Sequence, residues 1–173
     1  MPQNPYYPSS ITTFDYLSSI FFKNNWKWFI SNTEKDKINN ILMRIGLYDK
    51  KNISIENLSG GEMQKINIAL GLISGADVLL LDEPASNMDL NNQVNILKLL
   101  KELTSKNITI VIIMHDLSLA MKYGDNFIGI TNENKIIQKN SIDFFTPENL
   151  KEIFNMNFEI VKGQNNTYVQ ILD

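Results

Sequence analysis

Short, almost wholly apolar runs lie in the part of the chain after Asp77, and they constrain the fold more than any other feature. Val78 to Leu81 and Ile108 to Met114 are two such runs, and amphipathic helical stretches at 90–104 and 116–123 follow them. Continuous apolar strands that alternate with helices indicate a buried parallel sheet built from βαβ units. We therefore expect an α/β fold for this part of the chain.

The part of the chain before these strands has a helical pattern. Apolar residues between Thr12 and Ser74 recur at spacings of three and four, which indicates helices. The second of these helices is expected to begin at Thr33, within the capping-type residues 31–33, and to stop near Gly46. A chain of 173 residues is long enough for one domain with its own hydrophobic core.

The last part of the chain is expected to form a hairpin, a short helix and two closing strands. The hairpin strands are Phe127 to Thr131 and Lys135 to Lys139, and the helix is Pro147 to Phe154. The chain would then be one domain, with a helical part from about residue 10 to 75 and an α/β part from about 76 to 173.

The composition excludes several classes of function. A net charge of −3 and a pI near 5.2 provide no basic surface for nucleic acid, so no nucleic-acid partner is expected. The absence of cysteine excludes disulfides and thiolate metal sites. The apolar runs are far shorter than the roughly 20 residues that cross a bilayer, so any connection to a membrane must come through a partner.

A serine and two glycines precede a helical run. Ser59, Gly60 and Gly61 stand between Leu58 and Glu62. Such a helix start directs several N–H groups and a hydroxyl at one point, where the helix dipole also favours an anion. An ordinary serine cap with glycine beside it is the alternative interpretation.

Two adjacent carboxylates end the first apolar strand. Asp82 and Glu83 follow Leu81, at the carboxyl end of a parallel strand, where open α/β sheets bind their ligands. Asp82 is placed to hold Mg²⁺, directly or through water. Glu83 is placed to orient or deprotonate an attacking water. A solvated acidic turn after a core strand is the alternative.

The single histidine, His115, directly follows the second apolar strand. If the two strands are parallel, His115 lies on the same sheet edge as Asp82 and Glu83, close enough to address a γ-phosphate. A lone histidine before Asp116 is also common as a helix-capping or surface residue, but the order and spacing of the motifs favour the functional interpretation.

Together these features resemble the ATP-binding cassette (ABC) family. Leu58 to Glu62 resembles the family signature, Val78 to Glu83 its Walker B strand with the catalytic glutamate, and residues 86–89 its D-loop. His115 resembles the switch histidine and Gln3 the Q-loop glutamine. These five motifs occur in the family's order over nearly the whole chain.

The resemblance implies a partial P-loop NTPase, in which a RecA-like parallel sheet core without its first strands lies beside a helical ABC subdomain. It also implies hydrolysis of ATP with Mg²⁺ in a head-to-tail dimer, formed with a second copy or with another ABC ATPase subunit. Residues Ser59 to Glu62 would bind the γ-phosphate of the partner's ATP, and Asp89 would couple the two sites. Gln3 would sense Mg²⁺ and the attacking water.

The C-terminal motifs narrow the resemblance. Residues 115–120, 123–125 and 146–150 are similar to ATPase subunits of importers for iron chelates, haem or cobalamin. Such a subunit lies peripherally at the cytoplasmic face of the membrane, binds transmembrane permease subunits and works indirectly with a substrate-binding protein. Asn134 and Asn140 stand where the family commonly has glycine, a mild change because asparagine tolerates left-handed backbone.

The family's phosphate-binding loop does not occur in this sequence, which contains no G-x-x-x-x-G-K-[ST]. Without its N–H groups and lysine the β- and γ-phosphates lose their main contacts, so we expect the chain alone to be inactive. The gap in the sheet should also expose apolar surface. Either the loop is encoded upstream of Met1, or the chain is a separate subunit that supplies a signature face. Asp82, Glu83 and His115 favour the first, because they serve ATP bound to their own loop.

Two other functions stay open. A soluble ABC-type ATPase of repair, chromosome structure or translation would carry the same motifs, but the chain has no long coiled coil and no second cassette. A catalytically dead regulatory subunit is favoured by the lost loop and opposed by Glu83. Aromatic residues between Phe14 and Ile30, Trp26 and Trp28 above all, are expected to contact the membrane subunit, with internal packing as the alternative.

Overall fold

The structure is a computed structural model, and it describes residues 11–22, 29–86, 88–163 and 167–172. The chain divides into two compact units between Ile113 and Met114. The first unit contains the predicted helical part and both apolar strands, and the second contains His115 and the predicted hairpin.

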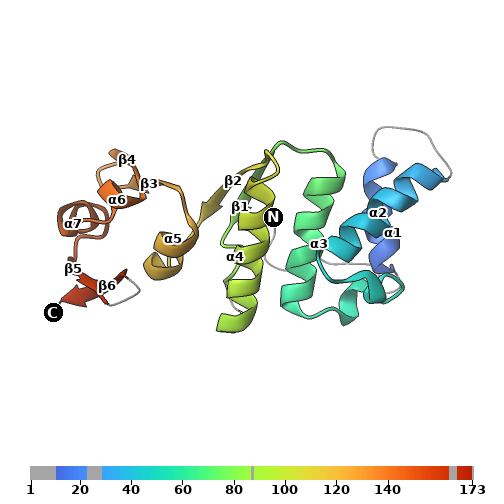
Figure 1. The fold of residues 1–173 in the computed structure, drawn as a ribbon, viewed down its shortest axis with the longest axis horizontal. Helices are drawn as coiled ribbons and strands as arrows, with labels where there is room; N and C mark the ends of the chain where they lie inside the picture. Colours follow the sequence, from blue (N-terminus) through green and yellow to red (C-terminus); the bar gives the residue numbers. More distant parts are fainter. Residues whose placement is uncertain (1–10, 23–28, 87, 164–166, 173) are drawn as a thin grey trace. The chain divides into compact units, whose positions relative to one another are not determined.

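Helices form the first part of the first unit (Figure 1). They are α1 (Thr13–Ser18), η1 (Ser19–Phe21), α2 (Asn32–Arg44), η2 (Tyr48–Lys50), η3 (Ile55–Asn57) and α3 (Gly60–Ile73). Their apolar faces meet in a core in which Leu17, Ile38, Leu42 and Ile66 are fully buried. The helical pattern of this part of the sequence is therefore confirmed.

Helix α2 begins one residue before the predicted Thr33. Ser31 is its N-cap: the Ser31 hydroxyl accepts a hydrogen bond from the Glu34 N–H (3.3 Å), and the Ser31 N–H donates to the Glu34 carboxylate (2.8 Å). Ser31 is selected over its neighbours because a glutamate stands three residues after it, which completes a capping box. After the helix, Gly46 has φ +71°, a backbone conformation that suits glycine, and the predicted stop is confirmed.

A βαβ unit completes the first unit. Strand β1 (Val78–Asp82) pairs with β2 (Thr109–Ile113), and α4 (Leu90–Thr104) connects them. The two strands are parallel and in register from Val78 with Thr109 to Asp82 with Ile113. The predicted parallel pair is thus confirmed, and its carboxyl ends lie at one edge.

The sheet that was expected to be buried is covered on one face, and its other face exposes apolar side chains. Leu79 is buried against α3, where it passes so close to Gly71 that a Cβ on that glycine would lie 2.7 Å from Leu79 Cδ2. On the opposite face Leu80, Val111 and Ile113 are exposed. The physical reason is that α3 and α4 of this unit pack on one face of a sheet that has only two described strands.

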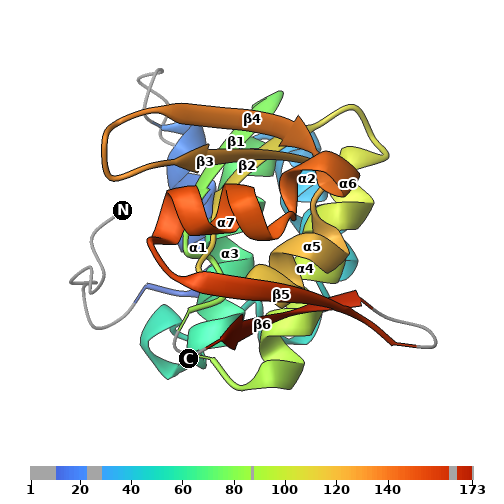
Figure 2. The ribbon, with the colours of Figure 1, turned by 90° about the vertical axis from the view of Figure 1, so that its left-hand side faces the viewer.

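The second unit packs two hairpins and three helices around an aromatic core. Its elements are α5 (Leu117–Tyr123), β3 (Asn126–Ile130), β4 (Ile136–Asn140), α6 (Ser141–Phe144), α7 (Pro147–Phe154), β5 (Asn157–Lys162) and β6 (Thr167–Leu172). Both strand pairs are antiparallel, and Figure 2 shows α7 between them. The predicted hairpin, helix and closing strands are confirmed.

The core of the second unit consists of Phe144, Phe145, Leu150, Ile153 and Phe158. The rings of Phe144 and Phe145 meet edge to face, with centroids 5.2 Å apart, an arrangement that aromatic pairs favour. This packing stabilises the short helix α6. The sequence pattern did not predict that helix.

The two asparagines at family glycine positions behave differently from each other. Asn134 has φ +61°, so it takes the left-handed conformation expected of a glycine replacement. Asn140 has φ −71° and caps α6, its side chain accepting a hydrogen bond from the Asp143 N–H (3.2 Å). The expectation of left-handed backbone therefore holds only for Asn134.

Neighbouring leucines of β1 should differ sharply in their effect on stability. Leu79 is 6% exposed and Leu80 is 76% exposed. We expect Leu79→Ala to lower the free energy of unfolding by about 3 kcal/mol, since it leaves a cavity against α3. Leu80→Ala should cost less than about 0.5 kcal/mol. Urea denaturation of both variants measures the difference, and equal losses would contradict the one-sided burial.

Candidate functional site

The signature motif begins helix α3. Ser59 is the N-cap: its hydroxyl accepts a hydrogen bond from the Glu62 N–H (3.4 Å), and its own N–H donates to the Glu62 carboxylate (2.9 Å). Ser59 and Gly60 are exposed at this helix start, and Gly61 is buried. The serine therefore acts as a cap, and the helix N-terminus that a phosphate would approach is formed as the sequence predicts.

Glu62, predicted to bind nucleotide together with Ser59, is engaged within the chain. Its carboxylate forms an ion pair with Lys50 of η2, with Nζ 2.6 Å from Oε1. The hydrogen bond from Lys50, followed by that from the Ser59 backbone, lowers the pKa of Glu62 from its usual 4.5. The carboxylate thus stays charged and holds the first turn of α3 against η2.

The predicted metal ligand Asp82 and the predicted catalytic residue Glu83 lie where β1 ends. Asp82 is the last residue of the strand and Glu83 follows it, and both are exposed. The Glu83 N–H donates to the Ile113 carbonyl of β2 (3.2 Å), and the Glu83 carbonyl accepts from the Ser86 N–H (3.1 Å). Strand pairing therefore fixes the backbone that carries the pair.

Glu83 has an unusual backbone conformation. Its φ is +43°, in the left-handed region that residues other than glycine and asparagine rarely adopt. Such strain persists only where surrounding contacts impose it, and it concentrates at functional sites. Here the hydrogen bonds to Ile113 and Ser86 impose it on the residue predicted to act on water.

Asp89 of the predicted D-loop begins α4. The Asp89 carboxylate accepts hydrogen bonds from the Asn92 N–H (3.0 Å) and from the Asn92 side-chain amide (2.6 Å). These bonds lower the pKa of Asp89. The loop before the helix is fixed as well, because Gln93 Nε2 donates to the Met88 carbonyl (3.0 Å).

The signature and the D-loop, which are far apart in sequence, meet at their helix starts. A Cβ placed on Gly61 would lie 3.4 Å from Asn92 Cγ and 3.5 Å from Asn92 Oδ1. Helices α3 and α4 are in contact along the first unit (Figure 1). Sequence reasoning did not find Asn92, although an asparagine three residues after a capping aspartate was a visible signal.

The structure does not test the places of the remaining predicted residues. His115 is exposed and belongs to the second unit, so its expected place beside Asp82 stays a prediction. Gln3, Trp26 and Trp28 lie outside the described residues.

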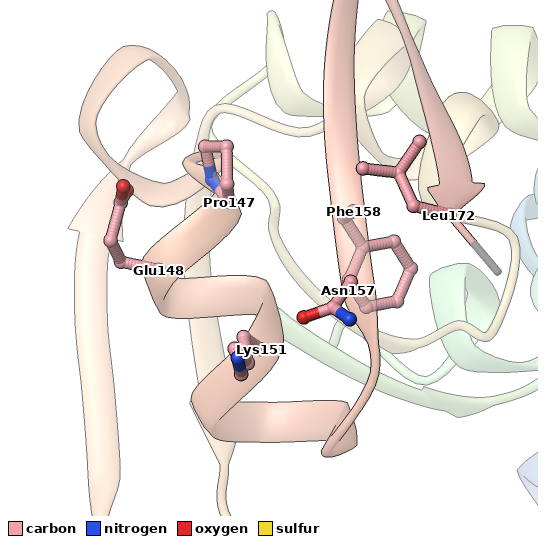
Figure 3. Close-up of a pocket in the computed structure, with 6 residues that line it drawn as sticks. All are labelled: Pro147, Glu148, Lys151, Asn157, Phe158 and Leu172. Carbon is pink, nitrogen blue, oxygen red and sulfur yellow. The ribbon is translucent and has the colours of Figure 1, made fainter.

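The second unit also has a hollow of about 320 Å³ between α7 and the β5–β6 hairpin (Figure 3). It is lined by Pro147, Glu148, Lys151, Asn157, Phe158 and Leu172, none of which is a predicted site residue.

Among the described residues, no group of three or more His, Asp or Glu side chains could hold a metal ion. Mg²⁺ in phosphate-transferring sites needs only one or two carboxylates, since waters and substrate phosphates complete its shell. The role of Asp82 as a Mg²⁺ ligand stays a prediction.

A model of the family described as "ABC transporter" matches residues 3–86, which include the signature and the Walker B strand. The iron(3+)-hydroxamate import ATP-binding protein of Bacillus subtilis is 33% identical over 93% of the chain and 61% of its own length. Residues 3–86 thus carry an ABC transporter domain, and the relatives of this chain are ABC ATP-binding proteins. The achromobactin transport ATP-binding protein of Dickeya dadantii is similar too, with 31% identity over 93% of this chain and 61% of its own length.

Solved structures agree with the ABC ATPase fold. A metal-chelate type ABC transporter in an inward-facing conformation matches 98% of this chain and 69% of its own with a TM-score of 0.85, and its 23% identity supports the fold alone. CbiO1 from Clostridium perfringens, part of the ABC transporter complex CbiONQ, has 29% identity and a TM-score of 0.68 over 82% of this chain and 55% of its own.

The chain is shorter than the relatives it matches. It spans 55% of an uncharacterized ABC transporter ATP-binding protein of Methanocaldococcus jannaschii, with 35% identity over 79% of this chain. In the part of the chain that the structure describes, no helix is long and apolar enough to cross a bilayer.

Acid should weaken the first unit through Glu62. Because the folded-state pKa of Glu62 is lowered from 4.5, the stabilisation is present above about pH 4.5 and is lost as the pH falls through the folded value. Urea denaturation between neutral and acid pH should show a shallower acid loss for Glu62→Gln than for the unchanged protein. Lys50→Met should act similarly, whereas Lys35→Met, at an exposed lysine of α2, should not. Identical acid profiles for all four proteins would contradict the Lys50–Glu62 contact.

Two substitutions at Glu83 should separate backbone strain from side-chain loss. Both Glu83→Gly and Glu83→Ala remove the carboxylate, but only glycine adopts φ +43° without a steric penalty. We expect the glycine variant to be more stable than the alanine variant by about 1 kcal/mol. Thermal or urea unfolding measures this difference, and a more stable alanine variant would count against strain at this position.

Proposed function

We propose that this chain is the ATP-hydrolysing part of an importer for iron chelates, haem or cobalamin. The observation that carries the proposal is the pair Asp82 and Glu83 at the end of β1, with Glu83 held in left-handed backbone. Such a residue is positioned by strand pairing rather than by its own preference, as expected of a group that must meet a substrate. The names of the achromobactin and iron(3+)-hydroxamate relatives support the substrate class.

In the proposed reaction, a water oxygen would bond to the γ-phosphorus of ATP bound with Mg²⁺, the bond from that phosphorus to the bridging oxygen would break, and ADP and phosphate would leave. Asp82 holds the Mg²⁺ directly or through water. Glu83 orients the attacking water and accepts its proton. His115 addresses the γ-phosphate from the end of β2, and Gln3 senses the Mg²⁺ and the water. These roles follow the residues' places in the family motifs.

The signature end of α3 acts on a second site in this proposal. Ser59, Gly60 and Gly61 offer a hydroxyl and backbone N–H groups at a helix N-terminus, which suits the γ-phosphate of ATP held by a partner. Glu62 contributes indirectly, because its carboxylate is committed to Ser59 and Lys50. Asp89 couples the two sites of the dimer.

The partners would be a second ABC ATPase subunit, or a second copy, and transmembrane permease subunits. A substrate-binding protein would act indirectly through the permease. Through these contacts the chain would lie peripherally at the cytoplasmic face of the membrane.

The isolated chain should not turn over ATP. Its sequence contains no G-x-x-x-x-G-K-[ST] motif, so the β- and γ-phosphates lack their usual backbone cradle and lysine. Phosphate release by the purified chain with ATP and Mg²⁺ should equal that of the Glu83→Gln variant. Steady-state turnover that Glu83→Gln abolishes would overturn this expectation.

The assembled transporter tests the proposed function itself. With the chain purified from membranes together with its permease and with the phosphate-binding loop that the site requires, Glu83→Gln should lower ATP turnover by about 100-fold or more, since a general base contributes that much. ATP binding and permease association should persist. Glu102→Gln, at an exposed residue of α4, is the matched control and should leave turnover unchanged. Unaltered turnover in Glu83→Gln refutes the role of Glu83, and failure to co-purify with a polytopic membrane protein favours a soluble ATPase.

A further inference from the structure

Asn92 is in contact with two motifs at once. Its side-chain amide donates a hydrogen bond to Asp89 (2.6 Å), and its backbone N–H donates another to the same carboxylate (3.0 Å). The other face of that side chain lies beside Gly61, where a Cβ would be 3.4 Å from Cγ and 3.5 Å from Oδ1. The three nearest heavy atoms given for that Cβ position all belong to the Asn92 side chain.

We propose that Asn92 is a positioning residue that links the first turn of α3 to Asp89, so that the signature and the D-loop respond to each other within one subunit. Only the functional consequence of this link rests on the proposed function: a phosphate bound at Ser59 to Gly61 would affect Asp89. The contact itself requires no nucleotide.

The chemistry of the position supports asparagine in this role. Asp89 is a charged acceptor that the Asn92 amide satisfies as a donor, whereas an aspartate at 92 would repel it. Gly61 is buried and carries no side chain, so the planar amide of Asn92 lies directly against the helix backbone. If the start of α3 or of α4 moves, the Asn92 amide moves too. The start of the other helix is then affected, because it contacts the same amide.

Contacts with residues other than Asn92 also hold the first turn of α3. The Lys50–Glu62 ion pair (2.6 Å) holds that turn to η2, and the capping box holds Ser59 to Glu62. With these contacts in place, the Gly61 side is where the turn meets α4. Asn92 is therefore placed to transmit movement between the two motifs.

A double-mutant cycle at Asp89 and Asn92 tests whether Asn92 links Asp89 to α3. It is measured by NMR on the full chain without nucleotide. The amide resonance of Gly61 is recorded in the unchanged protein, in Asp89→Asn, in Asn92→Ala and in the double variant. We expect Asp89→Asn to shift the Gly61 resonance when Asn92 is present and this response to be lost when residue 92 is alanine. A purely structural cap would not produce that dependence.

The control is Asn91→Ala, the exposed neighbour in the same helix turn, which should leave the response of Gly61 to Asp89→Asn intact. An equal response with and without Asn92, no response in the unchanged background, or loss of the response in Asn91→Ala would each overturn the proposal.

If Asn92→Ala does not fold, Gly61→Ala tests the contact from the other residue. We expect it to shift the resonance of the Asn92 side-chain amide, and an unchanged resonance would also overturn the proposal. Because no nucleotide is present, this result is independent of whether the chain hydrolyses ATP.

Discussion

The parallel pairing of β1 with β2 is the constraint on which the candidate site depends. It places Asp82 opposite Ile113 and lets the Ile113 carbonyl accept the Glu83 N–H (3.2 Å). The chain must then turn at Glu83 with φ +43°, which glutamate does not favour by itself. Sheet pairing therefore helps to hold the backbone of the predicted general base in this conformation.

Side-chain caps determine the rest of the site's geometry. Ser59 begins α3 and Asp89 begins α4, and each satisfies N–H groups that the first turn of a helix leaves unpaired. The same residues carry the motifs that resemble the signature and the D-loop. Local folding and proposed chemistry thus use the same atoms, so a functional role for Ser59 and its role as a cap are compatible rather than exclusive.

Much of the local structure could be predicted because it depends on neighbours in sequence. The apolar runs gave both strands, the helical spacing gave α3 and α4, and Asn-containing turns marked the hairpin of β3 and β4. The start of α2 was missed by one residue because three capping-type residues compete there and only Ser31 has a glutamate three positions later. Only one face of the expected buried sheet is covered, because apolar strands show which residues can be buried and not which elements cover them.

The sequence by itself determined the family motifs, their order and the side chains available for chemistry, because each motif lies within a few consecutive residues. Only the tertiary structure decided how these motifs use their side chains. In the tertiary structure Glu62 forms an ion pair with Lys50, Glu83 has a left-handed backbone conformation, and Gly61 lies against Asn92. Each of these depends on the packing of separate helices and strands, and distances between elements far apart in the chain follow from packing rather than from residue spacing.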